Sequence, residues 1–444
     1  MIHFFKSLYL NTRLFILLAI SVLLFIIAYF FPLLLIVAKI FLIVIATFFV
    51  CDLLLLYRLP KGIKATRNTP EKLSNGDQNR ILLKLESEYN FETNIQLIDE
   101  LPFQFQKRDV LLKEHLMPKI PKKIIYELRP TERGVYHFGA LNIYAQSPLS
   151  LAIKRYKFSI NKEVPVYPSF IQMRKYELMA ISNRLQNYGI KKLRRIGHSM
   201  EFEQIKEYVV GDDYRTVNWK ATARKGAIMV NQYQDERSQQ VFNLIDKGRV
   251  MKMPFEGLSL LDYAINTSLV IANVAIKKGD KTGLITFAEK MQTLLPASNR
   301  SKQLFNIQEL LYKEKTNFLE SDYQQLYATI RRQVNQRSLL LLYSNFETLP
   351  ALKRQLPYLR AIAKRHLLVV IFFKNTELQQ ILDQKAKDVE RIYQKTIAEK
   401  FNFEKKQIVK ELQKYGIQSI LTAPQKLTID TINKYLELKS RGFI

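Results

Sequence analysis

The 444-residue chain has few of the residues that build metal and redox sites. It contains one cysteine, Cys51, and only five histidines, at positions 3, 115, 137, 198 and 366. A single cysteine excludes an internal disulfide framework and a cysteine-clustered zinc site. The histidines have no ligand-like spacing, so we interpret each of them as structural or solvated.

The common enzyme motifs are also missing. The sequence has no Gly-x-x-x-x-Gly-Lys-Ser/Thr phosphate loop, no Gly-x-Gly-x-x-Gly fingerprint, no His-Glu-x-x-His pair and no Gly-x-Ser-x-Gly elbow. Only 14 Gly and 15 Pro accompany a hydrophobic fraction of 48%, which excludes a disordered, collagen-like or low-complexity chain. We therefore expect a folded, non-enzymatic protein without a cofactor.

Acidic residues are greatly outnumbered by basic ones. Lys plus Arg total 68 and Asp plus Glu total 40, which gives a net charge of +28. Such an excess favours acidic partners, either anionic lipid or nucleic acid. The basic cluster at residues 191–195 lacks interleaved aromatic residues, so we expect no nucleic acid and assign the excess charge to an anionic membrane surface.

Two long apolar runs lie near the N-terminus. Residues 14–31 carry no charge, and residues 33–51 are apolar apart from Lys39 and Thr47. At ~1.5 Å per helical residue, either run is close to the ~30 Å thickness of a bilayer core. Pro32 favours a turn between them, so the sequence predicts a transmembrane helical hairpin over residues 1–57. A cleaved signal peptide is the alternative. The apolar region of a signal peptide is shorter than these runs, however, and in this chain a second apolar run follows the first directly.

Basic residues flank the hairpin on both sides. They are Lys6 and Arg13 before it, and Arg58, Lys61, Lys64 and Arg67 after it. Positively charged flanks remain on the cytoplasmic side of a membrane. The sequence therefore predicts a two-pass protein of the inner (cytoplasmic) membrane whose soluble domains lie in the cytoplasm, a compartment in which a lone cysteine stays reduced.

Residues 58–170 and 241–444 differ in hydrophobic pattern. The first range has short alternating runs, such as 95–98, 124–128 and 135–138, bounded by turn residues. This pattern predicts an antiparallel, immunoglobulin-like β-sandwich. The second range alternates strands at 241–245, 284–287, 339–343, 367–373 and 419–421 with helices at 258–275, 302–312, 323–334, 352–363 and 427–438. It predicts an α/β doubly wound domain, and residues 379–414 are expected to form one long charged helix packed on it.

Residues 171–240 form a connecting region that is rich in charged, amide and aromatic side chains. Asp212 and Asp213 are adjacent, so their side chains diverge on a strand or a helix and make a poor catalytic pair. Arg215, close by, can form forked ion pairs with carboxylates. We therefore interpret the region as a structural ion-pair network at a domain junction, with an active site as the alternative.

This connecting region resembles a known family. The residues that carry the resemblance or lie among them are Glu201, Phe202, Tyr208, Gly211, Asp212, Asp213, Arg215, Asn218, Trp219, Ala223, Arg224 and Glu236. With Arg133-Gly134 and Ser147-Pro148-Leu149 in the sandwich, they resemble the bacterial "domain of unknown function 58" family over nearly the whole chain. The resemblance implies that the last domain is von Willebrand factor A-like. It also implies a protein partner, a MoxR-type AAA+ ATPase, because members are commonly encoded beside such ATPases.

A von Willebrand factor A domain that binds metal has Asp-x-Ser-x-Ser after its first strand, a Thr in a second loop and an Asp in a third. Here Asp246 is followed by Gly248 and Val250, neither of which supplies a hydroxyl, and Asn345 stands where the third-loop Asp is expected. Thr316 is the candidate for the second loop. Because magnesium needs six oxygen ligands, we predict a degenerate site that binds no metal.

Two further residues affect the predicted crevice. Asp246 is left nearly alone by these replacements, and Lys247 and Arg249 are expected to place positive charge where a cation would sit. The crevice around Asp246, Gly248, Thr316 and Asn345 is then free to bind a partner's carboxylate or loop.

Two functions from different classes follow. The preferred one is a membrane-anchored, non-enzymatic adaptor that presents the crevice to a protein partner in protein assembly or envelope maintenance. The alternative is a membrane-associated hydrolase or transferase that uses His198, Asp212, Asp213 and Arg215 in the 197–224 region.

Overall fold

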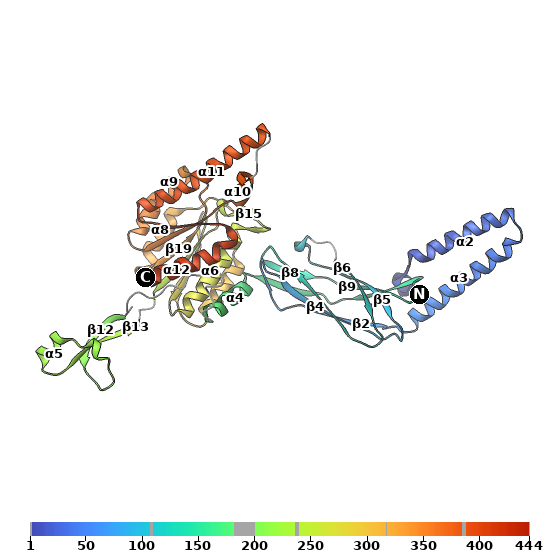
Figure 1. Ribbon diagram of the computed structural model, residues 1–444, viewed down its shortest axis with the longest axis horizontal. Coiled ribbons are helices and arrows are strands. Elements are labelled where there is room, and N and C mark those ends of the chain that lie inside the picture. Colours follow the sequence, from blue (N-terminus) through green and yellow to red (C-terminus); the bar gives the residue numbers. More distant parts are fainter. Residues whose placement is uncertain are drawn as a thin grey trace. The chain divides into compact units, whose positions relative to one another are not determined.

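A computed structural model describes residues 2–106, 110–181, 200–235, 239–316, 318–383 and 388–443 (Figure 1). The chain divides into two compact units, Met1–Tyr167 and Pro168–Ile444. Each unit has its own hydrophobic cores. The two are described separately below.

Two apolar helices dominate the start of the first unit. After α1 (Ile2–Ser7) and β1 (Leu8–Leu10), α2 spans Thr12–Phe30 and α3 spans Leu34–Tyr57, and the two lie side by side in Figure 1. Their mean hydropathies of 2.6 and 2.9, at 19 and 24 residues, make both long and apolar enough to cross a membrane. These helices fit the predicted two-pass hairpin. The second helix is longer than its predicted range of 33–51.

The extra turns of α3 belong to the sandwich. Asp52 is fully buried and accepts hydrogen bonds from the Ser147 hydroxyl and from the backbone N–H groups of Leu151 (2.9 Å) and Ala152 (2.7 Å). Lys154 Nζ donates to the carbonyl oxygens of Leu56 (3.1 Å) and of Leu59. The carbonyls at the end of α3, which have no partner within the helix, are therefore capped by a lysine from a strand.

Three β-sheets build the rest of this unit. Its strands after β1 are β2 (Ile63–Asn68), β3 (Leu73–Ser74), β4 (Asn79–Ser87), β5 (Thr93–Asp99), β6 (Val110–Leu116), β7 (Lys122–Leu128), β8 (Gly134–Phe138), β9 (Leu141–Gln146), β10 (Ala152–Phe158) and β11 (Lys162–Tyr167). They pair in the orders β1-β10-β9-β5-β6, β2-β4-β7 and β3-β11-β8, antiparallel except for β3 with β11. The alternating runs at 95–98, 124–128 and 135–138 fall in β5, β7 and β8, so the predicted antiparallel strands are confirmed there. Strand β1, which precedes the first apolar helix and pairs with β10, was not predicted.

One predicted membrane-flanking residue is a core residue. Arg67 forms an ion pair with Asp99, and the two side chains are 1% and 0% exposed. The Arg67 guanidinium also donates to the carbonyl oxygen of Gly139 at 2.9 Å. Arg67 therefore contributes to the sandwich interior and not to the basic flank, and the prediction that it marks the cytoplasmic side is wrong.

The second unit is built on a six-stranded sheet. Its strands are β14 (Gln240–Asp246), β17 (Lys281–Phe287), β18 (Met291–Ser298), β19 (Leu339–Tyr343), β20 (Leu367–Phe373) and β21 (Gln418–Thr422), in the order β18-β17-β14-β19-β20-β21. All pairs are parallel except β17 with β18. The five predicted strands are present. Strand β18 was not predicted, because it is half-exposed at the sheet edge and has no continuous apolar run.

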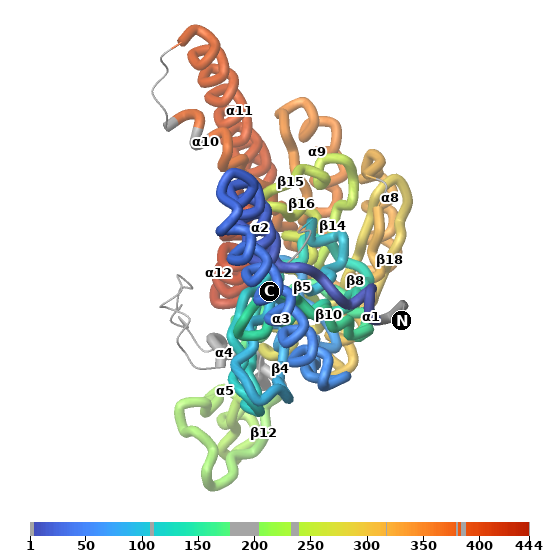
Figure 2. Tube along the Cα trace, turned by 90° about the vertical axis from the view of Figure 1, so that its right-hand side faces the viewer, coloured from blue at the N-terminus to red at the C-terminus, as the bar shows by residue number. Residues whose placement is uncertain are grey.

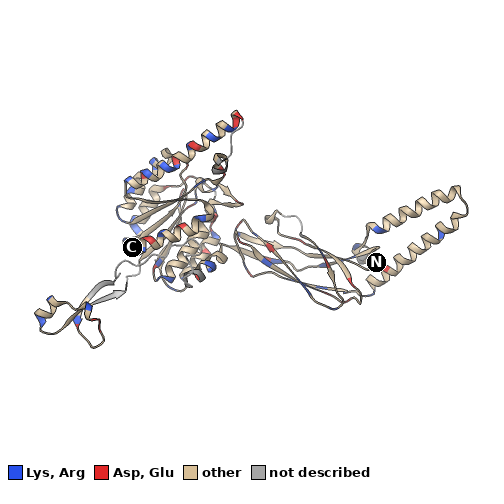
Figure 3. Ribbon diagram, viewed as in Figure 1, with Lys and Arg blue, Asp and Glu red and all other residues tan. Residues whose placement is uncertain are grey.

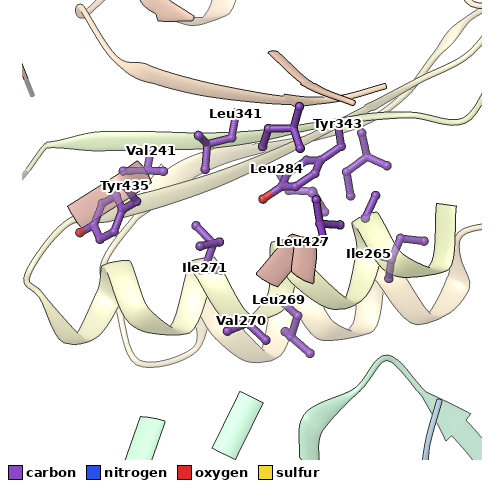
Figure 4. Packing of buried hydrophobic residues seen from close by; sticks show 14 of the residues in the cluster. Val241, Ile265, Leu269, Val270, Ile271, Leu284, Leu341, Tyr343, Leu427 and Tyr435 are labelled. Atoms are coloured by element: carbon purple, nitrogen blue, oxygen red, sulfur yellow. The ribbon is translucent and has the colours of Figure 1, made fainter. Parts of the chain in front are cut away.

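Helices cover both faces of this sheet. They are α4 (Phe170–Ile181), α6 (Leu260–Lys277), α7 (Gln303–Lys313), α8 (Tyr323–Gln333), α9 (Leu349–Ala363), α10 (Thr376–Asp383), α11 (Val389–Lys414) and α12 (Leu427–Ser440). One core contains residues of α6, α7 and α12, and the other contains residues of α8, α9 and α11. In Figure 4, Ile271 of α6 faces Val241 and Leu341 of the sheet. The expected doubly wound arrangement is therefore present.

The expected single helix over residues 379–414 is incorrect. Helix α10 ends at Asp383 and α11 begins at Val389. Ile408 and Leu412, near the end of α11, are buried, whereas Val389 and Ile392 are 83% and 55% exposed. Acidic and basic residues are interspersed along α11 (Figure 3). Only the C-terminal part of this helix packs on its domain as expected.

Candidate functional site

The candidate crevice lies where parallel strands end. β14 ends at Asp246, and Ser344 and Asn345 directly follow its neighbour β19. Because the carboxyl ends of parallel strands meet at one edge of a sheet, residues far apart in the sequence come together there. A cavity of about 280 Å³ opens at this edge and is lined by both Asp246 and Asn345.

Asp246 is fully buried and fully hydrogen-bonded. Its Oδ1 accepts from the Ser321 hydroxyl and from the Gly248 N–H at 2.8 Å. Its Oδ2 accepts from the Ser344 hydroxyl at 2.6 Å and from the Tyr323 hydroxyl at 3.1 Å. The expectation that Asp246 is nearly alone is therefore wrong, because three of its four partners come from segments 75 to 98 residues later in the chain.

Burial controls the titration of this cluster. It raises the pKa of the Asp246 carboxyl, and the hydrogen bonds from Ser321, Ser344, Gly248 and Tyr323 oppose that rise. Burial and the nearby Asp246 carboxylate together raise the pKa of the Tyr323 hydroxyl well above its usual value. Tyr323 therefore remains a proton donor to the carboxylate at neutral pH.

Position 248 requires a glycine because the Ser321 side chain approaches it closely. A Cβ at this position would lie 2.1 Å from Ser321 Oγ and 3.0 Å from Asp246 Oδ1. The Ser321 hydroxyl thus occupies the space that a side chain at position 248 would need, and it donates to the Asp246 carboxylate from there.

Lys247 does not add positive charge to the crevice. Its side chain is fully buried, forms an ion pair with Glu314 and donates to the carbonyl oxygen of Lys315 at 3.1 Å. Glu314 in turn accepts from Thr286 (2.8 Å) and Thr293 (2.7 Å). Neighbouring residues at a strand end face opposite ways, so Lys247 points away from Asp246 and the expectation for it is wrong. Arg249, by contrast, is exposed and lines the cavity.

Thr316 and Asn345 have other partners. The Thr316 hydroxyl donates to the Lys247 carbonyl oxygen at 2.7 Å and accepts from the Phe318 N–H at 3.0 Å, so it orders the loop. Asn345 is 3% exposed, and its Oδ1 accepts from Lys405 Nζ at 2.7 Å. Neither side chain is hydrogen-bonded to Asp246. Ser344 lies in the segment after 339–343 that the sequence indicates, whereas Ser321, Tyr323 and Lys405 were not predicted, since none of them stands at the carboxyl end of a predicted strand.

The predicted signature residues lie on a separate small module. Strands β12 (Met200–Glu207) and β13 (Met229–Asp235) form an antiparallel hairpin, and a short helix, α5 (Trp219–Lys225), lies between them (light green in Figure 2). Glu201 and Phe202 are in β12, but their side chains lie outside the described residues, as does the whole of His198.

Asp212 and Asp213 order the turns of this module. Asp212 accepts from Lys206 Nζ (3.0 Å) and from the Val209 N–H (3.0 Å), which together lower the pKa of its carboxyl. Asp213 accepts from the Arg215 N–H at 3.0 Å as a helix cap. The forked ion pair expected for Arg215 is not found within the described ranges. Its guanidinium instead lies 5.8 Å from the centre of the Tyr214 ring.

Asn218 caps α5. Its Oδ1 accepts from the Ala221 N–H at 3.0 Å, and its Nδ2 donates to Asn231 Oδ1 at 2.8 Å. Five further signature residues are exposed, namely Tyr208, Gly211, Trp219, Ala223 and Arg224, and Glu236 lies outside the described residues. The exposed fraction of Trp219 is 75%. In the described residues, the module places its polar signature groups on its own backbone and leaves its aromatic groups exposed.

Known proteins resemble parts of this chain. The uncharacterized protein YeaD of Bacillus subtilis (strain 168) is 26% identical over 186 residues, which are 41% of this chain and 41% of that protein. The crystal structure of the conserved hypothetical protein BatB from Bacteroides thetaiotaomicron matches 46% of this chain and 100% of its own, at 14% identity and a TM-score of 0.29. The CARDB domain of PF1109 from Pyrococcus furiosus matches 23% and 86%, at 12% identity and a TM-score of 0.17.

A family model supports the resemblance that the signature residues indicate. The model described as "Protein of unknown function DUF58" matches residues 204–403. This range holds most of the signature module and the sheet up to α11, and it leaves out the sandwich motifs. The matched range and the Bacillus relative together confirm that this part of the chain is similar to the DUF58 family of proteins of unknown function.

Proposed function

We propose that this protein is a membrane-anchored, non-enzymatic adaptor that binds a protein partner at the crevice beside Asp246. The observation that carries the proposal is the saturated, buried Asp246 carboxylate among the residues that line a cavity of about 280 Å³. Two donors on each oxygen use the lone pairs that a metal ligand or a general base would need. Asp246 then holds three loops in place and shapes a binding surface.

The order of the strands supports a von Willebrand factor A-like identity for the second unit. Asp246 ends the strand at the centre of the sheet, the first of its strands in the sequence, which is where the A-domain motif begins. Binding by such a domain without its metal relies on the cavity walls. These include two arginines, Arg249 and Arg354, beside the apolar Val250 and Phe346. Guanidinium groups suit a carboxylate on a partner's loop, and Glu320 and Glu347, which line the same cavity, suit a basic side chain beside it.

The partner and the membrane side are parts of the same proposal. A MoxR-type AAA+ ATPase is the partner that the family resemblance favours, in protein assembly or envelope maintenance. Arg58 and Lys61, which follow α3 directly, favour a cytoplasmic location for the soluble units next to an anionic inner-membrane surface.

The enzyme alternative has less support. It relies on Asp212, Asp213 and Arg215, but both carboxylates accept backbone N–H groups at turns, and Asp213 is exposed. A catalytic acid or base usually lies in a cleft that changes its pKa. Replacement Asp213→Asn keeps the cap acceptor, so it should leave folding and any cellular phenotype unchanged if the role is structural.

Site-specific crosslinking in intact cells tests the adaptor proposal. Photoreactive residues at Arg249 and Arg354 report on the crevice, and one at the exposed Lys278, at the end of α6, serves as a control on the same unit. We expect one dominant protein, an AAA+ ATPase, to be captured from both arginine positions and not from Lys278. Equal capture from all three positions, or none from the crevice, would refute the proposal.

A further inference from the structure

A second, larger cavity lies next to the crevice. It has a volume of about 520 Å³, within the range of ~300–1,000 Å³ typical of small-molecule sites. The segment after β14, the ends of β19 and β20, and helices α10 and α11 all contribute to it. Its apolar walls include Met253, Phe255, Leu260, Phe373, Leu378 and Phe401.

One end of this cavity is cationic. Lys405 of α11 is half-buried, and its Nζ donates to Asn345 Oδ1 at 2.7 Å and lies 5.6 Å from the centre of the Phe372 ring. Burial lowers the pKa of Lys405 to about 8, while Glu347 opposes this change. Lys374 and Glu347 are the other charged residues that line the cavity, and both are exposed.

Lys405 differs from Lys247 and Lys439 of the same unit in having no carboxylate partner in contact among the described residues. Lys247 has Glu314 as a partner, and Lys439 has Asp280 at 2.9 Å. Across the described part of the chain, no carboxylate lies within 4.0 Å of Lys405 Nζ, whose recorded partner is the neutral amide of Asn345. A half-buried ammonium group with no carboxylate in contact is poorly compensated, since Glu347 acts on it only at a distance, so an external anion would be bound favourably at this point.

Asn345 provides a second donor at the same end. Its Oδ1 is used by Lys405, Asn345 itself lines the cavity, and no acceptor for its Nδ2 occurs among the residues that the structure describes. A carboxylate has two oxygens and suits two adjacent donors. The apolar walls beyond them cannot hydrogen-bond and suit a hydrocarbon chain.

We propose that this cavity binds a monoanionic amphiphile, with its carboxylate on Lys405 and Asn345 and its hydrocarbon chain along the apolar walls. Such molecules partition into bilayers, and the chain carries two helices long and apolar enough to cross one. The site goes beyond the proposed adaptor function: Asn345 and Glu347 line both cavities, whereas Lys405 lines only this one and Asp246 and Arg249 line only the crevice.

Photolabelling of the full chain in phosphatidylcholine nanodiscs tests this site. The probes are a diazirine-bearing dodecanoic acid and the corresponding dodecanol, which share a chain and differ in the carboxylate. The variants are Lys405→Met, Lys405→Arg and the control Lys406→Met, which removes an exposed charge from the next position on α11. Hydrogen exchange in β19 and β20 checks that each variant is folded.

We expect the acid to label peptides of α10 and α11, and unlabelled dodecanoate to compete with it. Lys405→Met should reduce labelling about tenfold, since a hydrogen bond to a charged group is lost. Lys405→Arg should retain most of the labelling, and Lys406→Met should stay within about twofold of the original chain. The proposal is overturned if the alcohol labels these helices as strongly as the acid, or if folded Lys405→Met is labelled like the original chain.

Discussion

Replacement of Asp246 should destabilise the second unit far more than replacement of an ordinary capping aspartate. In Asp246→Ala, the Gly248 N–H and the Ser321 hydroxyl lose their acceptor, whereas the Tyr323 and Ser344 hydroxyls, 2.7 Å apart, can still bond to each other. Each donor left unsatisfied in a buried site costs about 1–3 kcal/mol. Two such donors predict a loss of about 2–6 kcal/mol in the free energy of unfolding.

Asp322→Ala is the matched control. Asp322 caps α8 by accepting from the N–H groups of Gln324 (2.8 Å) and Gln325 (3.0 Å), close in sequence to Ser321 and Tyr323. Loss of a helix cap costs about 1 kcal/mol. Both replacements change an aspartate to an alanine. The difference between their losses in the free energy of unfolding therefore isolates the contribution of the buried network from the general effect of losing an aspartate.

Pulse proteolysis of the full chain in urea measures both variants. Fragments that contain β14 and β19 report the unfolding of the second unit, and fragments of the sandwich serve as an internal reference in the same sample. We expect the urea midpoint of the second unit to fall for Asp246→Ala, with the sandwich midpoint unchanged. If Asp246→Ala cost no more than Asp322→Ala, the hydrogen-bond network would not hold the three loops, and the adaptor proposal would lose its main support.

Three further predictions concern other parts of the chain. Gly248→Ala should cost about 1–3 kcal/mol of stability because its Cβ would meet Ser321 Oγ at 2.1 Å, and the double replacement with Ser321→Gly should recover most of it, as judged by the same urea assay. Burial lowers the pKa of Lys154 to about 8, so between about pH 8 and pH 10 the unfolded chain binds more protons at this site than the folded chain does, and the stability of the sandwich should rise with pH. Lys154→Met should abolish this rise, as measured by pulse proteolysis with subtilisin. Trp219, the only tryptophan and 75% exposed, should be quenched by acrylamide almost as efficiently as a free indole, and strong protection in the isolated protein would contradict the exposed module.

Local patterns predicted most of the fold. The strands of the sheet are continuous apolar runs, and their alternation with amphipathic helices indicates a parallel sheet by itself. The elements that were not predicted correctly are those that are only partly buried. Strand β18 is half-exposed, and the charged pattern of α10 and α11 does not show the break between them.

The candidate site was predictable only in part. Parallel topology was enough to bring the ends of β14 and β19 together, which identified Asp246 and Asn345. Ser344 follows β19 and Gly248 follows β14, so both were within reach of the prediction, but Ser321 and Tyr323 were missed because they lie 75 and 77 residues away and do not follow a strand. Likewise, alternation along a strand should have directed Lys247 away from Asp246, but its partner Glu314 lies 67 residues further on and has no sequence signal.

The way the apolar helices join the sandwich has a mechanical consequence. Strand β1 pairs with β10 just before α2 starts, and Asp52 and Lys154 fasten the end of α3 to the start of the same strand. Both ends of the hairpin are thus clamped to one strand, with no free linker that could act as a swivel. If a thicker or thinner bilayer tilts the helices, the sandwich must therefore rotate with them.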